Sequence, residues 1–367
     1  MAKKGMPRRI GVLTGGGDCP GLNAVIRAVT KTAIVQYGME VIGIRDGYQG
    51  LVEANGEPLA SDAVSNILTV GGTILGTSNR ANPFRYAQEV ADGEFVFKDR
   101  SQDCVENYSN WELDGLVCIG GDGTLSIAKQ LMEKGLNVCG VPKTIDNDLS
   151  CTDVTFGFDT AVQVVSDAID RLHTTAQSHH RVMIVETMGR YAGWLALKGG
   201  LSGGGDIILI PEISYTTENV CDAVRKRGAR GKRCSIVVVA EGAKPKGGKL
   251  TVAKMDKAKH DQVRLGGIAV KLADEIEEST NLECRAAVLG HLQRGGTPTA
   301  FDRVLATQFG AVALDLVAKR QFGKMVALKG NKVVAAPLQS AVARLKLVDP
   351  DGPLVLTARK IGTSFGD

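Results

Sequence analysis

Short runs of apolar residues, rich in valine and isoleucine, recur along the chain, and each ends in glycine or in a polar turn. Apolar runs of this length are typical of strands that are buried on both faces of a parallel sheet. The expected strands lie within RIGVLTGGG (9–17), EVIGIRDG (40–47), GLVCIGGDG (115–123), NVCGVPKT (137–144), RVMIVETMG (181–189), DIILIPE (206–212) and CSIVVVAEG (234–242).

Segments that look helical separate several of these runs. A regular alternation of strand and helix predicts a doubly wound α/β architecture. A lysine-rich polar interval at 242–261 lacks this patterning, and we expect it to be a long surface excursion. The expected helices lie at 23–36, 124–134, 157–176, 191–202 and 217–227.

In doubly wound sheets, ligands bind outside the carboxyl ends of the strands. The chemistry is therefore expected in the loops that follow the strands. Those loops are GGGD (15–18), GGDGT (120–124), KTIDND (143–148), ETMGR (186–190) and AEG (240–242).

Composition narrows the class of partner. The 367 residues are enough for two lobes, and 44 Lys and Arg against 40 Asp and Glu give a dispersed net charge of +4. This balance favours an anionic small molecule over nucleic acid or a membrane surface. No apolar run reaches 18 residues, so we expect a cytoplasmic protein without a membrane span. The cysteines form no C-x-x-C pair, and we expect reduced thiols at 19, 104, 118, 139, 151, 221, 234 and 284.

The segment GGDGT at 120–124 joins an expected strand to an expected helix. Glycines at such a turn allow backbone N–H groups to approach phosphates closely, and Thr124 is expected to cap the helix. Asp122 would repel phosphates unless a divalent cation such as Mg²⁺ lay between them. A tight turn without a ligand is the alternative interpretation.

Three further motifs are ambiguous when taken singly. The glycines at 15–17 indicate only that the backbone approaches another group closely, and PKTIDND at 142–148 is also compatible with a surface turn. In GHLQRGG (290–296), His291 and Arg294 are three residues apart and could face one anion. A helix end followed by a glycine turn would explain the same residues.

In this order and at these separations, GGDGT, PKTIDND, ETMGRYAGW, AEG and GHLQRGG resemble the 6-phosphofructokinase family, over about residues 9–324. The resemblance implies two doubly wound, Rossmann-like α/β/α domains with the active site in the cleft between them. The donor-binding domain would comprise 1–157 plus about 293–343. The fructose 6-phosphate domain would comprise about 158–292 plus the C-terminal segment.

The resemblance also implies the reaction, which is phosphoryl transfer to the 1-hydroxyl of fructose 6-phosphate to give fructose 1,6-bisphosphate. Asp146 would take the hydroxyl proton, because a loose transition state needs only a weak base in position. Asp122 would bind Mg²⁺, Asp148 would support the ion or its waters, and Thr144 would contact the phosphoryl group. The expected catalytic residues are Asp146, Lys143, Thr144 and Arg190.

The resemblance also implies which residues bind each of the two substrates. In the family, Arg181 and Arg285 come from a neighbouring subunit, so a homodimer or homotetramer with shared active sites is expected. The expected sugar site comprises Thr144, Asp146, Arg181, Met188, Gly189, Arg190, Glu241, Arg285, His291 and Arg294. The expected donor site comprises Gly16, Gly17, Tyr48, Arg80, Gly121, Asp122, Gly123 and Thr124.

Two positions bear on the donor. Members that use pyrophosphate carry lysine at the position of Lys143 and aspartate at that of Gly123, so this chain is a hybrid. An aspartate at 123 would lie against the nucleotide α-phosphate, and two such charges 4 Å apart repel by about 4 kcal/mol at an effective dielectric near 20. Gly123 removes that obstacle, which favours ATP, with pyrophosphate as the alternative donor.

Two other classes of function remain open at this point. GGDGT alone would suit a kinase of NAD or of a lipid, but GHLQRGG and Arg285 argue against that acceptor. A non-catalytic nucleotide-binding protein would be favoured by loss of the base or the metal carboxylate, and both Asp146 and Asp122 are present.

Overall fold

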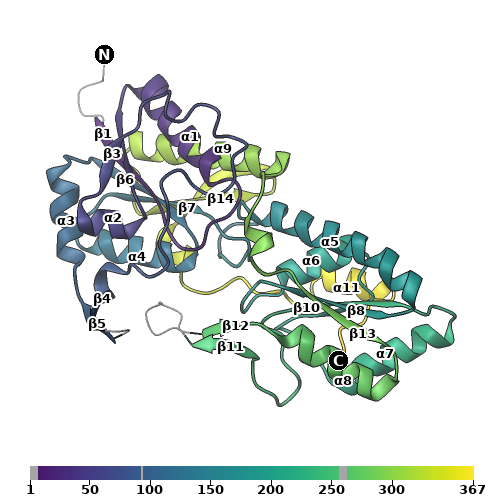
Figure 1. Ribbon diagram of the computed structural model, residues 1–367. Helices are drawn as coiled ribbons and strands as arrows, with labels where there is room; N and C mark the ends of the chain where they lie inside the picture. Colours follow the sequence, from purple (N-terminus) through teal and green to yellow (C-terminus); the bar gives the residue numbers. More distant parts are fainter. Residues whose placement is uncertain (1–6, 92–93, 256–262) are drawn as a thin grey trace.

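The computed structural model describes residues 7–91, 94–255 and 263–367, which form two lobes (Figure 1). Each lobe is built on its own sheet, and helices cover both faces of each sheet. The chain builds most of the first lobe, then the second lobe, returns to the first at about residue 300, and ends on the second. The expected α/β class with two Rossmann-like domains is confirmed.

The first sheet has seven strands in the order β15-β14-β7-β6-β1-β2-β3. The strand order reverses beside β1, because β2 pairs with one edge of β1 and β6 with the other, and this reversal is where such sheets bind ligands. The two edge strands, β3 and β15, are antiparallel to their neighbours. The strands are β1 (Arg9–Thr14), β2 (Glu40–Ile44), β3 (Gly56–Pro58), β6 (Gly115–Gly120), β7 (Val138–Pro142), β14 (Lys324–Lys329) and β15 (Lys332–Pro337).

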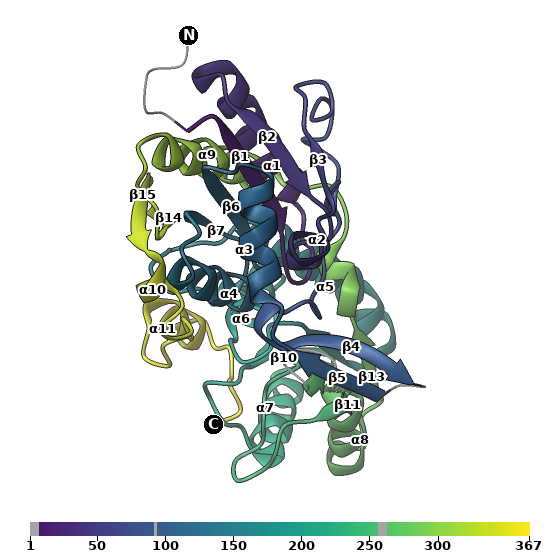
Figure 2. The same ribbon diagram turned by 90° about the vertical axis from the view of Figure 1, so that its left-hand side faces the viewer.

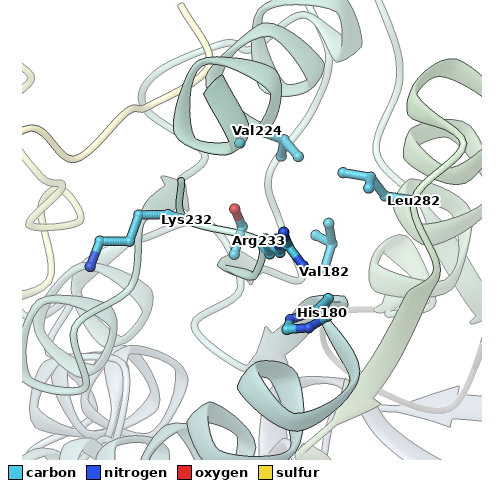
Figure 3. Close-up of a pocket in the computed structure, with 8 residues that line it drawn as sticks. His180, Val182, Val224, Lys232, Arg233 and Leu282 are labelled. Atoms are coloured by element: carbon cyan, nitrogen blue, oxygen red, sulfur yellow. The ribbon is translucent and has the colours of Figure 1, made fainter. Parts of the chain in front are cut away.

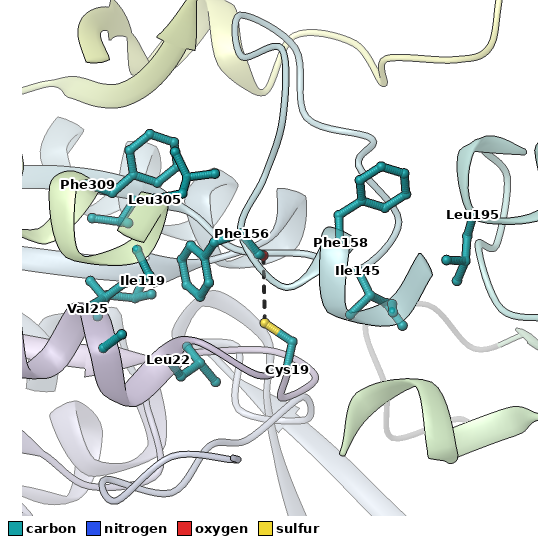
Figure 4. Packing of buried hydrophobic residues seen from close by; sticks show 14 of the residues in the cluster. Cys19, Leu22, Val25, Ile119, Ile145, Phe156, Phe158, Leu195, Leu305 and Phe309 are labelled. Carbon is teal, nitrogen blue, oxygen red and sulfur yellow. Dashed lines mark hydrogen bonds between the residues drawn. The ribbon is translucent and has the colours of Figure 1, made fainter. Parts of the chain in front are cut away.

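Alternate side chains of the central strands enter two different cores. In β6, Val117 and Ile119 pack towards α1 and α9, whereas Leu116 and Cys118 pack towards α2, α3, α4 and α10. Figure 4 shows the first of these cores, where the Cys19 thiol donates to the carbonyl of Phe156 at 3.8 Å. Helix α3, on the opposite face of the first sheet, is towards the viewer in Figure 2. The helices of this lobe are α1 (Leu22–Thr32) with its π-helical extension η1 (Ala33–Tyr37), α2 (Tyr48–Glu53), α3 (Ser101–Asn110), α4 (Asp122–Glu133), α9 (Ala300–Ala318) and α10 (Leu338–Ala341).

The second sheet is entirely parallel, with four strands in the order β13-β8-β10-β9. In β8, Met183 and Val185 pack towards α5, α6 and α11, while Val182 and Ile184 pack towards α7 and α8. The strands are β8 (Val182–Thr187), β9 (Ile207–Leu209), β10 (Ser235–Ala240) and β13 (Cys284–Val288). The helices are α5 (Phe158–His179), α6 (Trp194–Ser202), α7 (Thr217–Ala229), α8 (Ile268–Thr280) and α11 (Pro353–Lys360).

Smaller elements decorate this frame. Two antiparallel hairpins pair β4 (Tyr86–Ala91) with β5 (Glu94–Lys98) and β11 (Val252–Met255) with β12 (Val263–Leu265). Two 3₁₀-helices lie at η2 (Pro83–Arg85) and η3 (Gly290–Arg294). None of the helices in the described part of the chain is long and apolar enough to cross a membrane.

The seven expected strands and five expected helices are all present, with shifts at their ends. Three details differ. Helix α4 begins at Asp122 with Gly121 as its N-cap and no side-chain cap, so the interpretation of Thr124 as the cap is wrong. Helix α6 begins at Trp194 rather than at 191. Part of the polar interval 242–261 is strand β11, which the hydrophobic pattern does not predict, because backbone pairing with β12 stabilises it. Residues 256–261 of this interval lie outside the described part of the chain.

Candidate active site

Three loops of the first lobe meet at the carboxyl edge of its sheet. They follow β1, β6 and β7, which are adjacent strands. The N–H of Gly15 donates to the carbonyl of Ile119 at 2.9 Å, and the N–H of Lys143 donates to that of Gly120 at 3.0 Å. The segments GGGD, GGDGT and KTIDND are therefore contiguous in space, as expected from the strand order.

Gly15, Gly17 and Gly121 lie where these loops are in contact, and we call these three residues the glycine floor. A Cβ at Gly15 would lie 2.7 Å from Thr124 Oγ1, and one at Gly17 would lie 2.6 Å from Arg294 Nη1, so larger residues would displace both side chains. A Cβ at Gly121 would be 3.3 Å from the carbonyl oxygen of Lys143. A Cβ at Gly123 would meet nothing within 4 Å in the described structure, and this position faces open space.

The other two expected donor residues, Tyr48 and Arg80, lie on two sides of these glycines, one buried and one exposed. Tyr48 is buried and its hydroxyl donates to the carbonyl of Thr124 at 2.8 Å, so it supports the first turn of α4 from beneath. Arg80 is exposed, on a loop that contacts Gly16 through a hydrogen bond of 3.2 Å from the Gly16 N–H to the carbonyl of Ser78. These residues border the same glycine floor from two sides.

The KTIDND loop is buried and tightly bonded. The N–H of Asp146 donates to Thr144 Oγ1 at 3.0 Å, and Thr155 Oγ1 donates to the carbonyl of Thr144 at 2.7 Å. Asp146 is only 6% exposed. Within the described chain, Oδ1 of Asp146 and Oδ1 of Asp148 are buried without a hydrogen-bond partner. Buried polar atoms without partners are costly, so this loop is built to meet another group.

Burial and repulsion among carboxylates together determine the electrostatics of this loop. Burial and then the charges of Asp146 and Asp122 raise the pKa of Asp148 well above its usual value. Burial and then the charge of Asp146 raise the pKa of Glu241 to about 7. Asp122, Asp146 and Asp148 of the first lobe therefore lie close enough to interact, and Asp146 acts across to Glu241 of the second lobe.

The second lobe contributes the loops that follow β8 and β10. The N–H of Arg190 donates to Glu241 Oε1 at 3.1 Å, and Arg190 has a left-handed φ of 50°. The N–H of Met188 donates to Oε1 of Gln293 at 3.3 Å, which sets the 3₁₀-helix η3 beside this loop. Gly189 has a φ of 137°, a conformation that side chains rarely tolerate. Met188, Gly189, Arg190 and Glu241 are thus brought together.

Lys143 lies at the junction of the donor-side loops. Its ammonium is buried, which lowers its pKa, and it donates to the carbonyl of Gly17. Arg294 reaches the same loop, where Nη1 donates to the carbonyl of Asp18 at 3.0 Å. Within one chain, Arg294 is therefore on the glycine loop, while His291 is exposed on η3.

Arg181 and Arg285 are not brought to this site within one chain. Arg181 immediately precedes β8 and Arg285 is the second residue of β13, so both lie at the amino ends of their strands, and both pair with Glu283. Thr187 ends β8 at the opposite edge. At about 3.3 Å per residue, six residues of strand separate these edges by roughly 17 Å.

A pocket of about 190 Å³ lies on this amino-terminal side of the second sheet (Figure 3). It includes Val182 and Ser235, the first residues of β8 and β10, so it opens away from the loops described above. Its other lining residues are His180, Val224, Gly228, Lys232, Arg233 and Leu282. The candidate active site is therefore not this pocket.

Sequence reasoning missed two buried polar residues that shape the site. Gln293 is fully buried and also donates from Nε2 to the carbonyl of Gly290 at 3.0 Å. The carboxylate of Glu186 accepts from the N–H groups of Gly267 and Ala269, at the start of α8. An acid inside the apolar run of β8 was a signal for Glu186, whereas only its place within GHLQRGG marked Gln293.

Comparison with known proteins agrees with this geometry. The phosphofructokinase family model matches residues 9–317. An ATP-dependent 6-phosphofructokinase 2 of Clostridium perfringens is 54% identical over 98% of this chain and 99% of its own length. A pyrophosphate–fructose 6-phosphate 1-phosphotransferase of Amycolatopsis methanolica is 51% identical over 94% of this chain and 97% of its own length.

Solved structures agree on the fold. Pichia pastoris phosphofructokinase in the T-state superposes with a TM-score of 0.79 at 31% identity, covering 93% of this chain and 36% of the yeast chain. A pyrophosphate-dependent phosphofructokinase of Marinobacter aquaeolei gives a TM-score of 0.78 at 21% identity, covering 97% of this chain and 88% of that one. The family match over most of the chain, its close relatives and the shared fold establish that this chain belongs to the phosphofructokinase family.

Proposed function

We propose that this phosphofructokinase transfers the γ-phosphoryl group of ATP to the 1-hydroxyl of fructose 6-phosphate. The observation that carries the proposal is that the charge of Asp146 in the first lobe adds to burial in raising the pKa of Glu241 in the second lobe, and that Oε1 of Glu241 accepts from the N–H of Arg190. A donor held by one lobe would thus meet a sugar held by the other across Asp146. The family match favours this reaction over a NAD-kinase-like or non-catalytic nucleotide-binding role.

Asp146 is the proposed base. Its buried Oδ1 has no partner in the described chain, so it is available to accept the proton of the sugar hydroxyl. The hydrogen bond from its own N–H to Thr144 Oγ1 holds the loop while the proton moves. In a loose transition state the proton leaves late, so a weak base that is correctly positioned suffices. Thr144 is proposed to contact the phosphoryl group, and Arg190 to balance its charge.

Magnesium fits the carboxylates of this site. The buried Oδ1 of Asp148 has no hydrogen-bond partner in the described chain, and Asp122 lies close enough to act on it, so these two carboxylates could supply oxygen ligands to a hard cation. No three such side chains in the described residues form a complete metal cage, which agrees with the preference of Mg²⁺ for one or two carboxylates plus phosphates and water. We propose Asp122 as the ligand and Asp148 as its support. When bound, the ion would neutralise charge on the donor phosphates.

ATP is the proposed donor because of Gly123. Relatives of both donor types are about equally similar, so overall identity does not choose between them. The open space beside Gly123, on the first turn of α4, leaves room for a phosphate there. Lys143 donates to the carbonyl of Gly17, which holds its ammonium against the loop, where it would stabilise the leaving phosphate without excluding a nucleotide.

The position of two arginines supports shared active sites. Arg181 and Arg285 lie at the far edge of the second sheet from Glu241, which is compatible with their binding the sugar 6-phosphate of a neighbouring copy. We therefore propose a homo-oligomer in which each site takes residues from two chains. His291 is proposed to bind the same phosphate, and so is Arg294, which would first have to leave the carbonyl of Asp18. The cytoplasm is the proposed location.

Asp146→Ser tests the base. We expect kcat to fall about 10²- to 10⁴-fold, because proton transfer loses its acceptor, while the dissociation constant of fructose 6-phosphate changes little. Steady-state kinetics and calorimetry measure the two quantities. Asp153→Ser is the matched control, since Asp153 is an exposed aspartate of the adjacent loop that pairs with Lys329, and its kcat should stay near that of the wild type. Near wild-type turnover of Asp146→Ser would remove it from this role.

Mixed oligomers test the sharing of sites. Asp146→Ser and Arg285→Ala should each be poorly active alone. When the two are co-expressed, some sites would combine an intact Asp146 from one chain with an intact Arg285 from the other. We expect activity to exceed the sum of the separate variants, measured on purified mixed oligomers. No gain in activity would show that each chain completes its own site.

Gly123→Asp tests the donor. Paired initial rates with ATP and with pyrophosphate, at equal Mg²⁺, should favour ATP for the wild type. The variant should lower the ATP rate relative to the pyrophosphate rate by at least about tenfold, because a repulsion of about 4 kcal/mol at 4 Å would be only partly relieved. The variant should fold normally, since a Cβ at 123 meets open space. Unchanged ATP kinetics would contradict the argument.

Asp148→Asn tests the electrostatics. The raised pKa means that folded Asp148 holds its proton to a higher pH than the unfolded chain, whose value is near 3.8, so wild-type stability falls as pH rises through this window. The variant should therefore be more stable than the wild type at pH 8, by about 1 kcal/mol or more, with the difference shrinking towards pH 4. Chemical denaturation with chelator measures this. Added Mg²⁺ should narrow the difference, and a pH-independent difference would contradict the burial of a charge.

A further inference from the structure

We infer that Lys346 is a positioning residue for the reaction, because it holds Asn147, and thereby the two flanking aspartates, in the geometry the chemistry needs. The inference rests on the proposed function. Lys346 lies in residues 344–348, which we call the strap, on the path from β15 in the first lobe to α11 in the second (yellow in Figure 1). The strap is remote in sequence from every motif named above.

The ammonium of Lys346 donates all three of its hydrogen bonds to one loop. It donates to Asn147 Oδ1 at 2.9 Å and to the carbonyls of Thr152 and Asp153, each at 3.0 Å. An ammonium has three donors, and all three go to residues 147–153. Burial lowers the pKa of Lys346 to about 8, and the charges of Asp148 and Asp153 offset part of that change. The group is therefore still mainly an ammonium at neutral pH.

Asn147 is the residue whose conformation needs this support. It has a left-handed φ of 52°, which is unfavourable for residues other than glycine and least so for asparagine and aspartate. Its Oδ1 also accepts from the N–H of Thr155 at 3.1 Å. With Asn147 fixed in this way, the directions of Asp146 and Asp148 on either side are fixed as well. A change of φ at Asn147 would redirect both carboxylates.

The backbone of the strap reinforces the same loop. The N–H of Lys346 donates to the carbonyl of Asp148 at 2.7 Å. Leu345 forms an antiparallel bridge with Leu149, and Ser150 Oγ donates to the carbonyl of Arg344 at 2.8 Å. The strap thus pairs with residues 148–150 as a short strand would.

The strap also holds the second lobe. The carbonyl of Lys346 accepts from Trp194 Nε1 at 2.8 Å, and the ammonium lies 5.7 Å from the centre of the Trp194 ring. The carboxylate of Glu212 accepts from the N–H groups of both Gly193 and Val348. Gly193 and Trp194 directly follow the loop that carries Arg190. One residue, Lys346, therefore contacts both lobes beside the loops of the proposed site.

The test is Lys346→Met, which keeps the stem and removes the ammonium. We expect kcat to fall about 10- to 100-fold, because misplacement of a catalytic group by about 1 Å costs this much, while KM for fructose 6-phosphate and for ATP changes less than about threefold. Lys329→Met is the matched control. Lys329 is 53% exposed and bonds Asp153 of the same loop through its side chain, and its loss should leave kcat within about twofold.

A double variant separates positioning from general stability. If Lys346 acts through the amide of Asn147, then Lys346→Met combined with Asn147→Gly should be no slower than the slower single variant. Independent, multiplying losses of kcat would overturn the inference, as would wild-type kcat in Lys346→Met or an equal loss in Lys329→Met. Should Lys346→Met fail to fold, Lys346→Gln, which keeps two N–H donors, takes its place. The expected result is again a lower kcat with little change in KM for either substrate.

Hydrogen exchange gives a readout that needs no activity. In ligand-free protein, the amide of Thr155, which donates to Asn147, should exchange faster in Lys346→Met than in the wild type or in Lys329→Met. Unchanged exchange would overturn the inference. If instead the wild type transfers phosphate to fructose 6-phosphate from neither ATP nor pyrophosphate, the proposed function fails, while the exchange measurement still decides whether Lys346 holds the loop.

Discussion

The burial of carboxylates that repel one another is the constraint on which the rest of this structure depends. Burial and then the charges of Asp146 and Asp122 act on Asp148 at one edge of the first sheet, and burial and then the charge of Asp146 act on Glu241 of the second lobe. Such a group would separate if it could, because each acid gains from moving into water. The chain resists this separation with backbone hydrogen bonds and a buried loop, and it leaves carboxylate oxygens without partners in the described structure. The cation that we propose would offset part of this electrostatic cost.

The two lobes offer the different surroundings that the two proposed substrates need. A donor site needs close backbone approach, and glycines at 15, 17 and 121 provide it where loops from adjacent strands touch. The proposed sugar site needs side chains with defined direction, and the backbone of Arg190 is bonded to the carboxylate of Glu241. The charge of Asp146 acts on Glu241, so the proposed reacting groups of the two lobes lie near one another. The strap joins the two lobes beside these edges, because Lys346 bonds to Asn147 of the first lobe and to Trp194 of the second, and Glu212 binds Val348 of the strap to Gly193.

Similar chains that carry different donor names fit this arrangement. Relatives at 54% and 51% identity are named for ATP and for pyrophosphate, so the frame and the sugar side must serve both donors. We propose that a few positions near the first turn of α4 make the difference. Gly123 leaves open space there, and Lys143 is tied to the glycine loop. A change of one side chain at such a place alters charge and volume beside the donor without altering any strand.

By itself, the sequence determined the seven strands, the loops that follow them and the family, because buried parallel strands and glycine turns leave local patterns. It did not locate the start of α4, since Gly121 caps the helix without the side-chain cap expected of Thr124. The resemblance already assigned Arg181 and Arg285 to a neighbouring copy, and the tertiary structure supplied the physical reason, because both lie at the amino ends of their strands, away from Glu241. The tertiary structure alone joined Lys346 to Asn147, 199 residues away. No local periodicity encodes such a contact, because the path of the chain between the lobes decides which distant side chains meet.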